Sequence, residues 1–421
     1  MNIIEKMNLY SSIINKIYQS PDKLNFRWRI VNCILLLLLI SIVTLKYTNL
    51  GVPYLASTYV KQLIWISLGF FLVISLQWFR VQFLHEYAYH FYVILILLII
   101  STYFMPVIGG SQRWIFIGSL SVQPSEIGKL LLVFTLARLI SDFQGKITEV
   151  SLLSFTLILA LVPSILVFNQ PDFGTAIVYA FIAIPMLYWG GVSMFYIFYI
   201  IAPFISIISA FDLIAFSIWM LILIIVIYFH QSKILLSLIN FLINISFGVL
   251  SPFIWNNFLY NHQRERILTL FNPMRDPQGA GYQVIQSITA IGSGGVWGRG
   301  LGKGTQTQLR FLPVRDTDFI ISVIGEEMGL IGIILIMILF FMMLYWIISY
   351  AGTISNKFSS LTLIGFSSIL FIHLIVNIGM TVGLLPVTGL PVPFISYGGS
   401  FLITCFIMLA LANNIINKHI I

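Results

Sequence analysis

Residues 30–43 read IVNCILLLLLISIV and residues 221–229 read LILIIVIYF, and neither run contains a charged side chain. With their apolar flanks, both runs are long enough to cross the hydrocarbon core of a bilayer as helices. The whole chain has this character, since 59% of its 421 residues are hydrophobic and only 9% are charged. A soluble domain carries about 25% charged residues and cannot bury so much apolar surface. The sequence therefore predicts an all-α polytopic membrane protein.

Apolar windows bounded by glycine, proline or charge predict a bundle of about twelve transmembrane helices. The expected spans are 28–46, 59–79, 87–105, 124–142, 150–168, 174–190, 192–209, 211–229, 234–254, 319–349, 361–385 and 395–416. The segments between 192 and 229 are the least distinct as separate spans. The same division predicts an N-terminal segment at 1–27, nine spans in 28–254, a large loop at 255–318, three spans in 319–416 and a tail at 417–421.

Cations in the short loops predict the orientation of the chain. Bilayer proteins retain lysine and arginine on the cytoplasmic side. The cations before or at the start of the first span, after the second span, and near or after the end of the fourth span are Lys6, Lys16, Lys23, Arg27, Arg29, Arg80, Arg138 and Lys146. Both termini are therefore expected in the cytoplasm. The loop at 255–318 then lies outside it, where its length exempts it from the charge rule.

Composition also excludes some classes of function. The net charge of +8 is explained by topology, and no basic tail or arginine tract indicates a nucleic-acid partner. Cys33 and Cys405 both lie inside apolar runs, where neither a disulfide between loops nor a four-ligand zinc site can form.

The first polar motif, GGSQRWIFIGSLSVQPSEIGKLLL, occupies residues 109–132 and joins the third and fourth spans. Glu126 and Lys129 are three residues apart, on one face of the expected helix. A lone charge at that depth costs about 2.5–3.5 kcal/mol, so the two are expected to pair and to face protein or a water-filled cavity. A structural ion pair explains this spacing equally well. Arg113 and Trp114 favour a functional interpretation, because arginine binds phosphate in a bidentate manner and tryptophan suits the headgroup level.

Two further motifs carry carboxylates that local sequence also explains as helix caps. Asp172 in NQPDFGTA, residues 169–176, opens the sixth span, and Asp276 in the large loop precedes Pro277. The loop holds the cations Arg264, Arg266, Arg275, Arg299, Lys303, Arg310 and Arg315. They form either a solvated face or a site for an anionic substrate. The glycines at 292–304 do not have the spacing of a P-loop, which argues against nucleotide hydrolysis.

The last motif, NIGMTVGLLPVTGLPVPFISYGGS at residues 377–400, places several prolines at membrane depth. Irregular backbone there is tolerated only when it is packed in protein or lines a cavity. A re-entrant packing element and a lipid-lined groove both fit this pattern.

These blocks, in this order, resemble the SEDS family, which comprises RodA, FtsW and sporulation homologues. The resemblance covers most of residues 113–400 and rests on QRW…QPSEIGK, QPDFGTA, DPQGAGYQ, TDFI…GEE and GLLPVTGLP.PFISYGG. GTQTQLRFLP, at 304–313, is similar to RodA rather than FtsW. The resemblance implies a glycosyltransferase of the bacterial plasma (inner) membrane that polymerises lipid II during cell elongation. It also implies a class B penicillin-binding protein and other elongation-complex proteins as partners.

The resemblance further implies which residues form the site. Asp276 matches the family's essential loop aspartate, a catalytic residue. The residues that match other polar family positions, as candidates for substrate binding, are Arg113, Glu126, Lys129, Asp172, Gln283, Asp318 and Ser396. Val314 and Asp316 replace a glutamate and a histidine of the family, and Asn272 replaces an aspartate. The chain also holds an extra hairpin between 174 and 262, beyond the ten-span core of most relatives.

Sugar transfer from a diphosphate donor needs only one carboxylate, a base for the attacking hydroxyl, because the leaving group is already a stable anion. Asp276 is the expected base, with Arg113 and either Lys129 or a loop arginine stabilising the diphosphate. No carboxylate cluster has metal-ligand spacing. Whether a divalent cation assists the diphosphate stays open. The alternatives are an FtsW-type septal polymerase, a lipid II flippase or transporter, and a scaffold that recruits a synthase.

Overall fold

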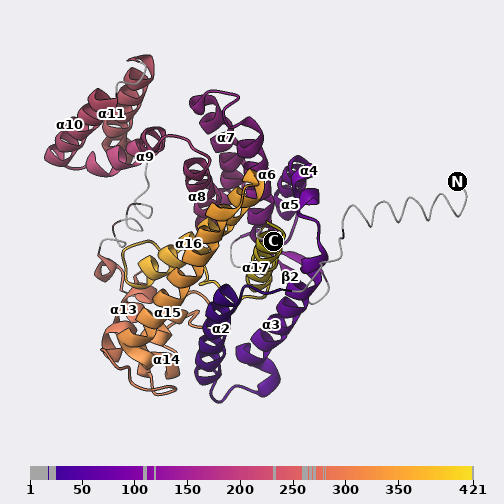
Figure 1. Cartoon of the computed structure of the whole chain (residues 1–421). Helices are drawn as coiled ribbons and strands as arrows, with labels where there is room; N and C mark the ends of the chain where they lie inside the picture. Colours follow the sequence, from indigo (N-terminus) through magenta and orange to yellow (C-terminus); the bar gives the residue numbers. More distant parts are fainter. Residues whose placement is uncertain are drawn as a thin grey trace, which may run out of the picture.

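The computed structural model describes residues 18, 25–107, 111–117, 120–230, 234–257, 264, 268, 272–277, 279 and 281–419. This part of the chain is mainly helical (Figure 1). Its long helices are α2 (Trp28–Thr48), α3 (Thr58–Ser75), α5 (Ala88–Thr102), α6 (Pro124–Phe143), α7 (Glu149–Phe168), α8 (Phe173–Trp189), α9 (Met194–Ser209), α10 (Leu213–His230), α11 (Ile234–Asn257), α15 (Ile320–Thr353), α16 (Lys357–Thr381) and α17 (Gly399–His419). The shorter elements are η1 (Tyr54–Ala56), η2 (Leu76–Trp78), α4 (Val81–Glu86), β1 (Ile115–Ile117), β2 (Leu120–Val122), η3 (Pro273–Arg275), α13 (Tyr282–Gly294) and α14 (Thr305–Gln308).

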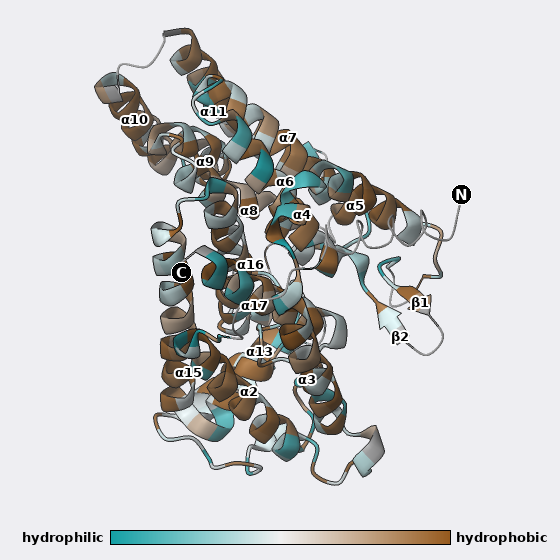
Figure 2. Ribbon diagram, turned by 45° about the vertical axis from the view of Figure 1, so that its right-hand side comes forward, coloured by the Kyte–Doolittle hydropathy of each residue, from teal (hydrophilic) through white to brown (hydrophobic). Residues whose placement is uncertain are grey.

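The long helices have the character of membrane spans. Seven of those described are long and apolar enough to cross a bilayer, namely α2, α3 with η2, α7, α11, α15, α16 and α17. The helices α5, α8, α9 and α10 are apolar but shorter. Each predicted span overlaps one long helix, and the ribbon in Figure 2 has the colour of hydrophobic residues along most of the helices. The predicted all-α polytopic fold is confirmed, whereas the limits of the loop and membrane segments stay a prediction.

Helices α16 and α17 form the centre of the bundle. In α16, 83% of the most apolar stretch is buried, and in α17 78%, against 22% in α3. Helix α16 packs against α6, α8 and α15, and α17 packs against α3 and α6. A Cβ atom at Gly365 would lie 2.5 Å from Val133 Cγ1, so this glycine lets α16 approach α6 closely.

Helices α9, α10 and α11 form a small unit at one edge of the molecule, in both views (Figures 1 and 2). Buried polar groups join them: Trp219 Nε1 donates to Ser206 Oγ at 2.8 Å, and Ser206 Oγ donates to Asn244 Oδ1 at 2.5 Å. Such pairs are favoured because hydrocarbon offers no other hydrogen-bond partner. The indistinct segments between 192 and 229 are thus two helices, α9 and α10.

The segment between α16 and α17, residues 382–398, is not helical. Side chains satisfy its backbone: Asn377 Nδ2 donates to Leu390 O at 2.7 Å, and Ser41 Oγ donates to Ile395 O at 2.6 Å. Phe394 is buried and has a φ of 63°, a strained left-handed conformation for a residue with a side chain. The expected irregular backbone is therefore packed in protein.

The end of the large loop is anchored to α15. Ser287 Oγ on α13 lies 2.6 Å from Ser322 Oγ on α15. The buried Glu326 carboxylate accepts hydrogen bonds from the backbone of Gln306 at 2.8 Å and of Thr307 at 3.0 Å, which caps α14. These contacts hold the loop against the first turns of α15.

Candidate functional site

A cavity of about 660 Å³ lies where α3, α6, α8 and α17 meet the segments before β1, before α15 and between α16 and α17. Lys61 and Arg113 supply cations to its lining, and Glu126, Asp172 and Asp318 supply carboxyl groups. Aromatic lining comes from Trp65, Trp114, Tyr397 and Phe401. The cavity thus combines apolar walls with a few convergent polar groups, the usual composition of a ligand site. Four of the predicted site residues meet here, although they come from distant parts of the sequence.

Asp172 has a structural role at the cavity wall. Its carboxylate accepts from Thr175 N at 3.2 Å, which caps α8 as the local sequence predicts, and from Gln123 Nε2 at 2.9 Å. Arg113 Nη1 lies 3.8 Å from the same carboxylate. Arg113 also donates to the backbone oxygens of Gln170, at 3.3 Å from Nε, and of Pro171. Its side chain is 29% exposed, so an anion in the cavity can reach the positioned guanidinium.

The predicted ion pair in α6 is present. Lys129 Nζ lies 2.7 Å from Glu126 Oε2 and 2.9 Å from His373 Nε2 on α16. Lys129 is fully buried, and it is not among the described residues that line the cavity. Glu126, in contrast, does line it. Glu126 is therefore the member of the pair that lies at the cavity wall, and Lys129 lies behind it.

Asp318 lies just before α15. Asn377 Nδ2 donates to its backbone oxygen at 2.8 Å, which connects this turn to α16. Burial raises the pKa of the Asp318 carboxyl above its ordinary value, and a hydrogen bond with Thr317 partly offsets the increase. A raised pKa makes this carboxylate a stronger base than an exposed aspartate.

Asp276 lies between η3 and α13, and it is not among the described residues that line the cavity. Its side chain is exposed, and Oδ1 accepts from Gly279 N at 3.0 Å. The carboxylate thus stabilises a turn rather than capping α13, for which Gly281 is the N-cap residue. Gln278 and Ala280, next to this turn, lie outside the described residues. The catalytic role of Asp276 stays a prediction.

Gln283 and Ser396 are also absent from the described lining. Gln283 is half-buried on α13. Ser396 Oγ donates to Thr317 O at 2.6 Å and accepts from Val392 N at 2.8 Å, so it stabilises the irregular segment. Their roles in substrate binding stay predictions.

Asp316, one of the departures from the family pattern, and its neighbour Arg315 join the large loop to the turn between α2 and α3. Asp316 Oδ2 accepts from Thr58 Oγ1 at 2.7 Å and from Asn49 Nδ2 at 3.3 Å. Arg315 Nη2 donates to Thr48 O at 2.7 Å. Val314 has a φ of 52°, a strained conformation for a β-branched residue. Asp316 therefore has a structural role next to the cavity.

Sequence reasoning did not single out Lys61, Trp65 or His373. His373 is an ionisable residue inside an apolar span, and that signal alone marks a functional candidate. Lys61 lies in the first turn of α3 and is exposed, a pattern that local sequence cannot distinguish from a solvated cation. Among the described residues, no three His, Cys, Asp or Glu side chains converge as metal ligands.

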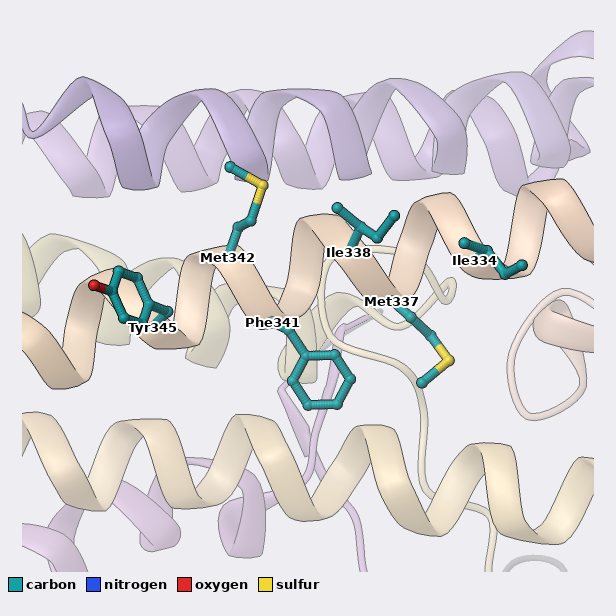
Figure 3. A pocket seen from close by; sticks show the side chains of 6 residues that line it. All are labelled: Ile334, Met337, Ile338, Phe341, Met342 and Tyr345. Atoms are coloured by element: carbon teal, nitrogen blue, oxygen red, sulfur yellow. The ribbon is translucent and has the colours of Figure 1, made fainter.

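A second hollow, of about 520 Å³, follows one side of α15 (Figure 3). The described residues that line it carry no charged side chain; they are Ile334, Met337, Ile338, Phe341, Met342 and Tyr345. Such a surface suits lipid tails and offers no charged group to bind an anion. The cavity with Arg113 and the three carboxyl groups is therefore the candidate site.

Comparisons with known proteins agree with this architecture. The family model of the FtsW, RodA and SpoVE cell cycle proteins matches residues 24–220 and 203–419. The chain is 33% identical over 341 residues to the peptidoglycan glycosyltransferase MrdB of Escherichia coli K12, covering 80% of each chain. It is 28% identical to the peptidoglycan glycosyltransferase RodA of Treponema pallidum, covering 90% of this chain and 96% of the relative.

A solved structure has the same fold. It comes from work on the structural coordination of polymerization and crosslinking by a peptidoglycan synthase complex. The matching chain has a TM-score of 0.69 and 25% sequence identity, with 94% of this chain and 99% of that chain covered.

Proposed function

The chain belongs to the FtsW, RodA and SpoVE family of cell cycle proteins, and we propose that it is a peptidoglycan glycosyltransferase. It polymerises lipid II, the undecaprenyl-diphosphate-linked disaccharide-pentapeptide, into glycan strands during cell elongation. Two relatives matched over 80% or more of their length bear the name peptidoglycan glycosyltransferase, MrdB of Escherichia coli and RodA of Treponema pallidum.

One observation carries the proposal: the cavity brings Arg113 and Lys61 together with Glu126, Asp172 and Asp318. Arginine binds phosphate oxygens in a bidentate manner, and an exposed lysine adds a second cation. Trp65, Trp114 and Phe401 offer surfaces for sugar rings or for the polyprenyl chain. Because Lys129 is buried and paired with Glu126, Lys61 is the better second cation for the diphosphate.

The reaction is a displacement at the anomeric carbon of the donor. A sugar hydroxyl of the acceptor forms the new C–O bond, the bond to the diphosphate breaks, and undecaprenyl diphosphate leaves with the bonding electrons. A carboxylate takes the hydroxyl proton. Arg113 and Lys61 stabilise the charge that develops on the diphosphate oxygens, an electrostatic contribution that is usually large.

Asp276 is the proposed base, on the strength of its place in the DPQGAGYQ motif. It is exposed, so an acceptor strand that approaches from the loop side can reach it. Asp318 is a second candidate, because it lines the cavity and burial raises its carboxyl pKa. A divalent cation stays open as an assistant to the diphosphate.

As a multi-pass membrane protein, the chain is proposed to reside in the bacterial plasma membrane. Both termini face the cytoplasm, and the loop at 255–318 lies on the opposite side. A class B penicillin-binding protein supplies transpeptidation as its partner, with other elongation-complex proteins. The solved peptidoglycan synthase complex, which includes a chain of this fold, supports such an assembly.

The proposal is tested with purified protein and fluorescent lipid II. We expect glycan ladders from the wild type. Of the variants Asp276→Asn and Asp318→Asn, the one that removes the base should form no ladders. Asp212→Asn serves as a matched control, because Asp212 caps α10 in the peripheral unit and asparagine caps helices equally well.

Each other outcome has a defined meaning. If lipid II crosses liposome membranes without being polymerised, the protein is a transporter. If the protein shows neither activity, the scaffold alternative is favoured. If both variants polymerise at the wild-type rate, neither carboxylate is the base. Localisation of the protein at the septum rather than the sidewall would favour the FtsW-type alternative.

A further inference from the structure

His373 joins three parts of the cavity wall from behind. Its Nε2 atom lies 2.9 Å from Lys129 Nζ, and its Nδ1 atom lies 3.1 Å from Pro391 O. Its ring stacks on Phe401 with centroids 4.4 Å apart and an interplanar angle of 19°. Pro391 and Phe401 line the cavity, as does Glu126, the ion-pair partner of Lys129. His373 and Lys129 are both 0% exposed, so neither is open to solvent.

The two ring contacts define the tautomer of His373. A backbone carbonyl only accepts hydrogen bonds, so Nδ1 must carry the proton that it donates to Pro391 O. In the neutral ring, Nε2 then has a lone pair and accepts a hydrogen bond from the Lys129 ammonium. An imidazolium would instead direct an N–H at the ammonium, with two positive charges in contact. The geometry therefore fits a neutral ring between a donor and an acceptor.

This arrangement orients Lys129 as well. The ammonium forms an ion pair with Glu126 on one side and contacts His373 Nε2 on the other, and its Nζ atom lies 5.2 Å from the centre of the Phe401 ring. Without the His373 acceptor, one N–H of a fully buried ammonium would lose its partner, which is costly in an apolar environment. The ammonium would then shift, and the Glu126 carboxylate would shift with it.

We propose that His373 is a positioning residue for the sugar transfer, which holds Lys129 against Glu126 and fixes Pro391 and Phe401 in the cavity wall. The inference rests on the proposed function, since it concerns the same cavity. His373 touches no substrate: it acts through Glu126 and through the irregular segment. A displacement of about 1 Å in such a site can lower the rate by about a hundredfold.

Two substitutions separate positioning from simple packing. His373→Gln can still donate to Pro391 O and accept from Lys129. His373→Phe keeps a ring to stack on Phe401 but has no acceptor for Lys129. We expect His373→Phe to lower kcat at least tenfold with KM changed less than twofold, and His373→Gln to recover most of the rate. His85→Phe is the matched control, because His85 lies on α4, outside the described lining of the cavity.

Wild-type kcat in His373→Phe, or equal loss in both folded variants, would overturn the proposal. A second measurement covers the case in which His373→Phe does not fold. The ¹⁵N spectrum of histidine-labelled wild-type protein should show a protonated Nδ1 and an unprotonated Nε2 for the signal that disappears in His373→Gln. Any other protonation state contradicts the proposed contact. If the wild type forms no glycan, the proposed function is wrong, whereas the ¹⁵N spectrum still decides the His373 contact.

Discussion

Arg113 Nη1 lies 3.8 Å from Asp172 Oδ1, across 59 positions of sequence. The contact orients a partly exposed guanidinium at the wall of the cavity and satisfies part of the buried Asp172 carboxylate. The Asp172 carboxylate thus has two contacts: it caps the first turn of α8, and it orients Arg113, which is proposed to bind the phosphate.

Arg113→Lys should impair polymerisation although the charge is kept. Lysine cannot bind the diphosphate in a bidentate manner or keep the contacts to Gln170 O and Pro171 O at the same time. We expect kcat/KM for fluorescent lipid II to fall about tenfold or more, in line with a lost charge-assisted hydrogen bond of about 1.5–3 kcal/mol. Arg29→Lys, outside the described lining of the cavity, should retain the wild-type value. Equal activity of the two variants would contradict the role of Arg113.

Lys129→Met should destabilise the protein through the charge that it leaves behind. Removal of one partner of a buried ion pair costs about 3–5 kcal/mol, because the remaining charge is uncompensated. The double variant Glu126→Gln with Lys129→Met should recover much of that loss. Thermal unfolding in detergent of the wild type, both single variants and the double variant measures the coupling. Strictly additive losses would show that the two groups do not stabilise each other.

Asp318→Asn should stabilise the protein at neutral pH. Burial raises the folded-state pKa of Asp318 above the ordinary value of 3.8, so the folded state binds this proton more tightly than the unfolded state. The stabilisation from that proton is complete below pH 3.8 and is lost as pH rises through the folded-state pKa.

The Tm of Asp318→Asn should therefore exceed that of the wild type at pH 7, and the difference should shrink as pH is lowered. Asp212→Asn controls for the loss of one negative charge on an exposed turn. A constant difference across the pH range would mean that the Asp318 carboxyl does not change its protonation preference on folding.

Asn244→Ala should weaken the α9–α11 unit but leave catalysis intact. The substitution removes the partner of Ser206 Oγ and of Asn240. Interhelical hydrogen bonds in membrane proteins contribute about 0.6 kcal/mol on average and up to about 1.7 kcal/mol. The free energy of unfolding should fall by about this amount and Tm should fall with it, while the polymerisation rate stays within twofold of the wild type. A large loss of rate in a folded variant would connect this unit to the site.

Glu326→Gln should loosen the end of the large loop. The carboxylate accepts from Gln306 N, Thr307 N and Thr307 Oγ1, and an amide oxygen replaces only part of these charge-assisted bonds. Hydrogen exchange at the Gln306 and Thr307 amides should become faster, with no change in the middle of α16. Unchanged exchange would show that other contacts hold α14.

The fold class and most of the helices are predictable from the amino-acid sequence alone. Uninterrupted apolar runs of span length have one stable outcome in a bilayer, where each helix satisfies its own backbone hydrogen bonds. The pairing of Glu126 with Lys129 was also predictable, because residues three positions apart share one face of a helix. Motif order was enough to indicate the family.

Which of the polar residues lie close together is seen only in the folded chain. Asp172 and Asp318 line one cavity with Arg113, while Asp276 and Ser396, from equally specific motifs, have other contacts. The sequence shows His373 as an ionisable residue inside a span, but only the fold shows that it contacts Lys129, 244 positions away. Such contacts depend on how rigid helices pack side by side. No periodicity along one helix encodes which face of another helix it will meet.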